Sequence, residues 1–97
     1  MIGDRKRIKN QLRKYETLLA RKVLGLSEQE LRDLIADLGA RLEQEKCDTT
    51  LRFTREWCQR SGHDFFHVAD SLGQLGGLCD CEVLANIRPT SIFAEYD

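Results

Sequence analysis

No stretch of this chain contains the roughly 20 consecutive apolar residues that a membrane-spanning helix requires. Residues 1–5 also lack the apolar core of a secretion signal. Disulfides are unusual in proteins that remain in the cytoplasm. We therefore expect a cytoplasmic protein without membrane contact, whose four cysteines are reduced thiols.

The signatures of several enzyme classes are also missing. The sequence has no Ser-His-Asp order, no glycine-rich phosphate loop and no helix with the paired glutamate and histidines of the zinc proteases. It has no internal repeat and no low-complexity segment. We therefore favour a non-enzymatic protein, and keep a thiol redox protein or a metal-dependent enzyme as an alternative.

What the chain does contain is typical of one small soluble domain. Its 97 residues are 41% hydrophobic and 32% charged, as in ordinary globular proteins. A domain of this length buries only a modest core, so a bound metal would add substantially to its stability.

The first half of the chain predicts two amphipathic helices. Apolar residues recur every three or four positions over residues 5–24, and Gly25 is a natural stop. Ser27 and Glu30 form the capping-box pattern that begins a second helix. We expect the two helices to form an antiparallel hairpin, with Gly39 permitting a close helix contact. The apolar face of the second helix consists of Leu31, Leu34, Ile35, Leu38 and Leu42.

The second half predicts two shorter helices, over about 48–60 and 64–74, ended by Gly62 and Gly76. The apolar run 82–87 is expected to be a short strand or extended segment. The fold class is therefore an all-α domain of about four helices, with an extended C-terminal segment after the cysteine turn. We divide it into a basic helical hairpin or arm, 1–45, and a cysteine-bearing helical module, 46–97, within one compact domain.

Three cysteines occupy positions suited to a metal. Cys79 and Cys81 follow the Gly76-Gly77 turn, and Cys47 lies where a helix begins. Thiolates bind zinc, and a helix N-terminus favours the thiolate form. Cys58 lies about 16 Å from Cys47 along a helix axis, so we interpret it as a buried apolar side chain.

The fourth ligand is left open by the spacing. His63 and His67 lie four residues apart and can share a helix face, and we take His67 as the candidate. Asp48, Asp80 and Glu82 are oxygen alternatives. Water in the fourth position would be typical of a catalytic zinc site. Two other readings remain: reduced cysteines that only pack, and a strained, redox-active Cys79–Cys81 disulfide.

Charge is unevenly distributed along the chain. Residues 1–24 carry eight basic and two acidic side chains, a net charge of +6, whereas the whole chain has a net charge of −1. The ordinary explanation is a solvated helix face, or one that meets the next subunit in a homodimer formed by the N-terminal helices. The alternative is nucleic-acid binding through phosphate contacts. Its candidate residues are Arg5, Lys6, Arg7, Lys9, Arg13 and Lys14.

Two motifs, C-D-T-T-L-R-F-T from Cys47 and G-G-L-C-D-C-E-V-L-A-N from Gly76, resemble a small bacterial family. It is the domain of unknown function catalogued as twenty-six ninety-five, and the resemblance covers about residues 45–88. It implies that Cys47, Cys79 and Cys81 act together and that Glu82 and Asn86 support them, as we also expect of Asp48. It implies no activity.

Many members of that family carry histidine where this chain has Thr49, which would complete a set of three cysteines and one histidine. Here His67 or His63 would have to supply that ligand from a facing helix. The function we predict is a bacterial accessory or interaction domain with a structural zinc, and its partner is another protein or a second copy of the chain.

Overall fold

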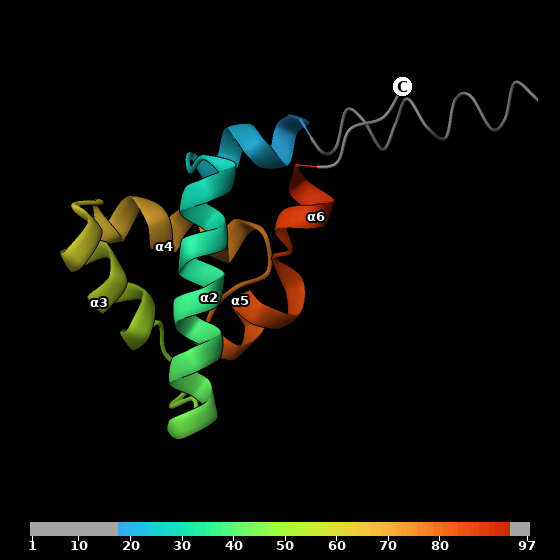
Figure 1. Cartoon of the computed structure of the whole chain (residues 1–97). Helices are drawn as coiled ribbons and strands as arrows, with labels where there is room; N and C mark the ends of the chain where they lie inside the picture. The colour runs from blue at the N-terminus through green and yellow to red at the C-terminus, as the bar shows by residue number, and fades with distance from the viewer. Residues whose placement is uncertain (1–17, 94–97) are drawn as a thin grey trace, which may run out of the picture.

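The computed structural model describes residues 18–93, and all regular secondary structure in that range is helical. Residues 18–24 form the first described helical segment. It is followed by α2 (Glu28–Gln44), α3 (Arg52–Ser61), α4 (Phe65–Gln74), α5 (Asp80–Asn86) and α6 (Pro89–Ile92) (Figure 1). The predicted all-α class is confirmed.

The predicted start of α2 is also confirmed. The Glu30 backbone N–H donates to Ser27 Oγ at 3.1 Å, and the Ser27 backbone N–H donates to Glu30 Oε1 at 2.8 Å. Gly25 separates α2 from the preceding helical segment with a φ of +68°, a conformation that glycine adopts without strain. The reciprocal hydrogen bonds satisfy two backbone donors that the first turn of a helix otherwise leaves open.

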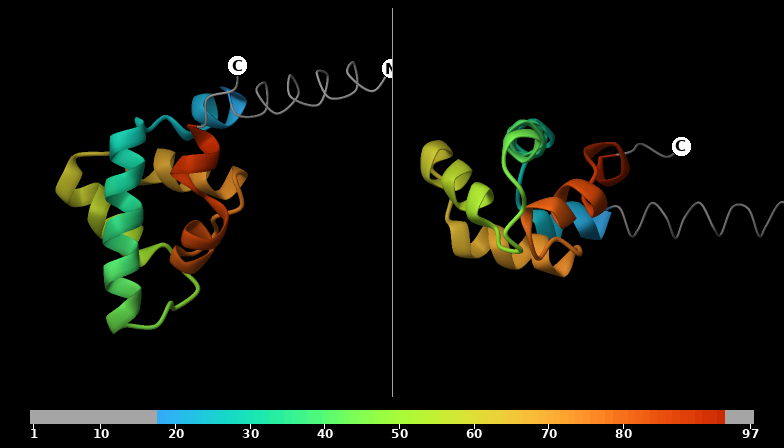
Figure 2. Two further views of the ribbon diagram at one scale, coloured as in Figure 1. Left: turned by 45° about the vertical axis from the view of Figure 1, so that its right-hand side comes forward. Right: turned by 90° about the horizontal axis from the view of Figure 1, so that it is seen from below.

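Helix α2 lies in the middle of the bundle. It contacts α3 on one side and α5 and α6 on the other, and α4 packs against α3 and crosses behind α2 (Figures 1 and 2). The core therefore combines side chains from both halves of the chain. Its fully buried members include Leu31, Leu34, Leu38, Phe53, Leu72, Val83 and Ile87.

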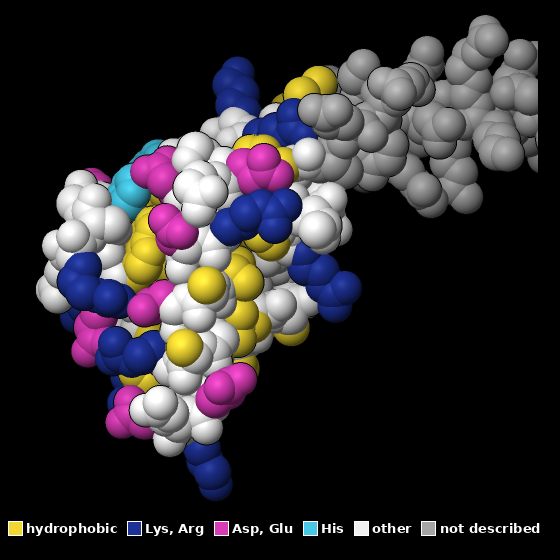
Figure 3. Space-filling model, in the orientation of Figure 1, with side chains coloured by type: hydrophobic (Ala, Val, Ile, Leu, Met, Phe, Trp, Pro, Cys, Tyr) yellow, Lys and Arg dark blue, Asp and Glu magenta, His cyan; other side chains and the backbone are white. Residues whose placement is uncertain are grey.

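Exposed ion pairs cover the outer surface of this core. Arg32 pairs with Glu28 at 3.2 Å, and Arg60 of α3 pairs with Asp37 of α2 at 2.9 Å. Figure 3 shows basic and acidic side chains mixed over this face of the molecule. Such exposed pairs each contribute little to stability, so the apolar core provides most of it.

The arrangement at the N-terminal side differs from the predicted hairpin. Residues 18–24 lie across the N-terminal end of α2 and do not run alongside it (Figures 1 and 2). The rest of the predicted first helix, 5–17, lies outside the described residues. The expected close contact at Gly39 is wrong, because a Cβ built there would meet no atom within 4 Å.

Two boundaries in the second half also differ from the prediction. Helix α3 begins at Arg52, not near residue 48, because the Asp48 carboxylate accepts the Thr50 backbone N–H and forms a turn ahead of the helix. The segment 82–87 belongs mostly to α5, so the predicted extended segment is wrong. Val83 and Ile87 are four residues apart and both face the core, which is a helical pattern hidden in a short apolar run.

A three-cysteine candidate metal site

The fold brings Cys47, Cys79 and Cys81 together. Their three Sγ atoms lie within 4.8 Å of one another, and the Cys79 and Cys81 sulfurs are 3.4 Å apart. Cys79 is buried, Cys47 is half-buried and Cys81 is exposed. The cluster therefore joins the loop before α3 to the start of α5 and is open to solvent on the Cys81 side.

Asp80, between the two adjacent cysteines, fixes this junction. Its backbone N–H donates to the Thr50 carbonyl at 3.1 Å. Its carboxylate, only 1% exposed, accepts the backbone N–H groups of Phe53 at 3.0 Å and Thr54 at 3.2 Å, and the Thr54 hydroxyl at 2.7 Å. Asp80 therefore caps the N-terminus of α3, and its oxygens are occupied by these donors and not directed to a metal.

This capping role was not predicted from the sequence. The available signal was the absence of a local cap, because Leu51 occupies the N-cap position of α3 and has no side-chain acceptor. The acceptor comes from a residue 26 to 27 positions further along the chain. No pattern within the helix itself identifies such a partner.

The turn before Cys79 is held by Asn86. The Asn86 side-chain amide donates to the Gly76 carbonyl at 2.9 Å, and Gly76 has a φ of +94°. The Gly77 backbone N–H donates to the Leu72 carbonyl at 2.7 Å. These contacts link the end of α4 to α5 and orient the segment that carries Cys79 and Cys81.

Backbone donors surround the Cys47 sulfur. The Cys81 N–H, followed by that of Thr49, outweighs the opposing effect of burial and lowers the pKa of Cys47 below its ordinary value of 9.0. Thr49 has a φ of +68°, which β-branched residues rarely adopt. The strained turn at Thr49 thus contributes to stabilising a thiolate at Cys47.

Cys79 has the opposite tendency. The Glu82 backbone N–H favours its thiolate, but burial and the neighbouring Cys81, Cys47 and Glu82 side chains outweigh it and raise the pKa of Cys79 to about 12. Three thiolates this close together repel one another. A divalent cation removes that repulsion and deprotonates its thiol ligands, so the cluster has the donor chemistry of a soft or borderline metal site.

The other predicted site residues have different places. Glu82 Oε1 lies 3.5 Å from Cys79 Sγ, beside the cluster. Asp48 is exposed, forms the turn with Thr50 and pairs with Arg52 at 3.5 Å. In the part of the chain that the structure describes, the group of candidate ligand atoms contains the three sulfurs and no fourth donor.

The structure does not bring either histidine to the cysteines. His67 lies beside Gly25, where an added Cβ would be 3.0 Å from His67 Nε2. His63 stacks on Trp57 with ring centroids 5.0 Å apart and pairs with Glu30 at 2.7 Å. Cys58 is buried in the core, as expected, and burial followed by the charge of Asp64 raises its pKa.

The site and the fold define a small all-α protein with a cluster of three thiols. The chain belongs to the family described as a protein of unknown function (DUF2695), which it matches over residues 34–86. It is similar to uncharacterized proteins of Mycobacterium bovis and Mycobacterium tuberculosis. Each of these is 28% identical over 89 residues, which cover 92% of this chain and 90% of the relative.

No solved structure matches the chain. Over the described residues, no helix is both long and apolar enough to cross a membrane. The candidate nucleic-acid residues, Arg5 to Lys14, lie outside the described part of the chain. The cysteine cluster is therefore the feature that supports a functional proposal.

Proposed function

We propose that this protein is an accessory or interaction module in which Cys47, Cys79 and Cys81 hold a structural zinc ion. The observation that carries the proposal is the convergence of three sulfurs within 4.8 Å from two separate segments of the chain. Zinc binds cysteine thiolates readily, and its remaining position is open here to water or to another donor. Free cysteines persist most readily in a reducing compartment, and a cytoplasmic location is part of this proposal.

The role of the ion would be to hold the loop before α3 against the start of α5. Asp80 already joins these two segments. Cys47 precedes α3, whereas Cys79 and Cys81 stand at the start of α5. A metal shared by these residues joins the two segments at a second point, next to the Asp80 cap. Because the ion binds the folded chain and not the unfolded chain, its binding free energy adds to the free energy of unfolding.

Cys81→Ser tests this role. The Cys81 side chain is exposed, so without a metal its replacement should change the free energy of unfolding by less than about 0.5 kcal/mol. With a structural zinc, we expect the melting temperature to fall by more than about 10 °C. Treatment of the wild type with a chelator should produce a similar fall and should leave Cys81→Ser unchanged.

Cys58→Ser is the matched control. This thiol is buried away from the cluster, so its loss should destabilise the core while the response to chelator remains. The structural role would be contradicted by two results together. The wild type would melt at the same temperature with and without chelator, and Cys81→Ser would melt at that temperature too.

A further inference from the structure

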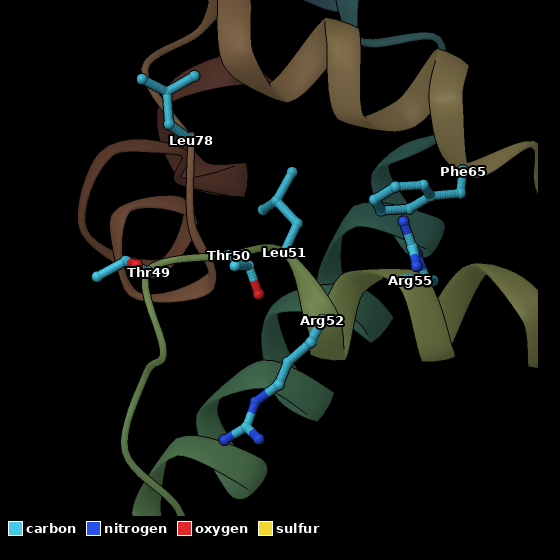
Figure 4. A pocket seen from close by; sticks show the side chains of 7 residues that line it. All are labelled: Thr49, Thr50, Leu51, Arg52, Arg55, Phe65 and Leu78. Carbon is cyan, nitrogen blue, oxygen red and sulfur yellow. The ribbon is translucent and has the colours of Figure 1, made fainter.

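Two hollows meet along α3 and α4, next to the cysteine cluster. The first, of about 470 Å³, is lined in part by Leu51, Arg55, Phe65 and Leu78 (Figure 4). The second, of about 400 Å³, shares Arg55 and Phe65 and extends to Phe66. We call these two neighbouring hollows, which share Arg55 and Phe65 in their lining, the α3–α4 groove.

Each end of the groove presents a large apolar side chain to solvent. Leu78 is 68% exposed in the first hollow, and Phe66 is 77% exposed in the second. They are the most exposed large apolar side chains among the described residues. Leu51 and Phe65 lie between them, half-buried against the core. Exposed apolar residues gathered around a depression are typical of a protein interaction surface.

Arg55, which lines both hollows, places a positive charge in the middle of the groove. The Arg55 guanidinium lies over the Phe65 ring, 4.7 Å from its centroid, and no carboxylate among the described residues pairs with it. The neighbouring acid, Asp64, accepts the Phe66 backbone N–H and caps α4. Every other arginine described on α2 and α3 pairs with an acid: Arg32 with Glu28, Arg41 with Glu56, Arg52 with Asp48 and Arg60 with Asp37.

We propose that the α3–α4 groove binds an acidic segment of a partner protein. A carboxylate of the partner would pair with Arg55, whose guanidinium packs over the Phe65 ring and can make a bidentate contact. Apolar side chains on either side of that acid would cover Leu78 and Phe66. The two neighbouring hollows suit a peptide with three such contacts better than a compact small molecule. The proposal does not depend on the zinc site.

The test is a titration of the full-length, isotope-labelled protein with two synthetic peptides, followed by NMR. One capped peptide alternates glutamate with leucine and phenylalanine, and the other has glutamine in place of every glutamate. We expect the acidic peptide to shift resonances of Leu51, Arg55, Phe66 and Leu78 first, and to bind at least about tenfold more tightly than the glutamine peptide.

Two variants of α3 make the result specific. Arg55→Gln should weaken binding of the acidic peptide about tenfold, whereas Arg60→Gln on the same helix, outside the groove, should leave it unchanged. Both positions are exposed, so both variants should fold. Equal binding of the two peptides, or equal effects of the two variants, would overturn the inference. Concentration-dependent self-association that Arg55→Gln abolishes would also overturn it, because the groove would then bind a second copy of the chain.

Discussion

Asp80 connects two parts of the chain through a single buried carboxylate. It accepts two backbone N–H groups and one hydroxyl at the start of α3. In Asp80→Ala these three donors lose their acceptor in a region closed to water. We expect the free energy of unfolding to fall by about 3 kcal/mol, measured by chemical denaturation.

Asp70→Ala is the comparison for that change. Asp70 is exposed on α4 and accepts only from the Gln74 side chain, at 3.0 Å. Its replacement should cost less than about 0.5 kcal/mol. Similar losses in the two variants would show that the Asp80 cap is not a major contact of the fold.

Glu30 gives the stability of the protein a dependence on pH. The Ser27 backbone N–H outweighs burial and lowers the pKa of Glu30 below its ordinary value of 4.5, with further contributions from the Ser27 hydroxyl and from His63. A lowered carboxyl pKa adds stability above the unfolded-state pKa, and this stability is lost as the pH falls through the folded-state pKa.

Glu30→Gln isolates the charge, because glutamine can still accept the Ser27 N–H. At neutral pH we expect the wild type to be more stable than this variant by about 0.5 kcal/mol, a value typical of an exposed acid at a helix N-terminus. The difference should shrink as the pH falls below 4.5. Urea unfolding at neutral and acidic pH measures it, and a constant difference would show that the charge has no role.

At the scale of the helices and the turns between them, replacing glycine by alanine should have opposite effects at two positions. A Cβ on Gly77 would lie 2.7 Å from Val83 Cγ2 and 2.8 Å from Ile87 Cδ1, both buried in the core at or just after α5. Gly77→Ala should therefore destabilise the protein by about 1–3 kcal/mol. Gly39 lies within α2 with no atom in the way, so Gly39→Ala should stabilise by up to about 1 kcal/mol.

Thermal unfolding of the two glycine variants tests how closely α5 packs on the turn that precedes it. A neutral or stabilising Gly77→Ala would mean that α5 can move away from α4 without cost. The cysteine turn would then be less rigid than the contacts of Gly77 and Asn86 indicate.

The helices differ in how well the sequence predicts them. Helix α2 combines a long apolar repeat with a capping box, and both signals are local, so its start at Ser27 was predictable. Helix α5 has seven residues, too few for periodicity to distinguish a helix from a strand. The start of α3 was misplaced because Asp48 forms a turn and the actual cap, Asp80, is distant in sequence.

For the molecule as a whole, the cysteine site was predictable in part. Spacing and turn residues indicated that Cys47, Cys79 and Cys81 meet, and the described structure groups them. The place of His67 depends on how α4 packs against the other helices, which its four-residue spacing from His63 does not specify. The α3–α4 groove likewise depends on tertiary packing and has no sequence motif.

The central claim is that the three cysteines hold one zinc ion. The most direct test is native mass spectrometry of the untagged protein, with elemental analysis of the same sample. We predict a mass excess of one zinc per chain for the wild type and Cys58→Ser, and its loss in Cys81→Ser. The same spectrum reports whether the chain forms the predicted homodimer. The claim would be contradicted if the wild-type chain carried no zinc and had free thiols after purification from zinc-sufficient cells under reducing conditions.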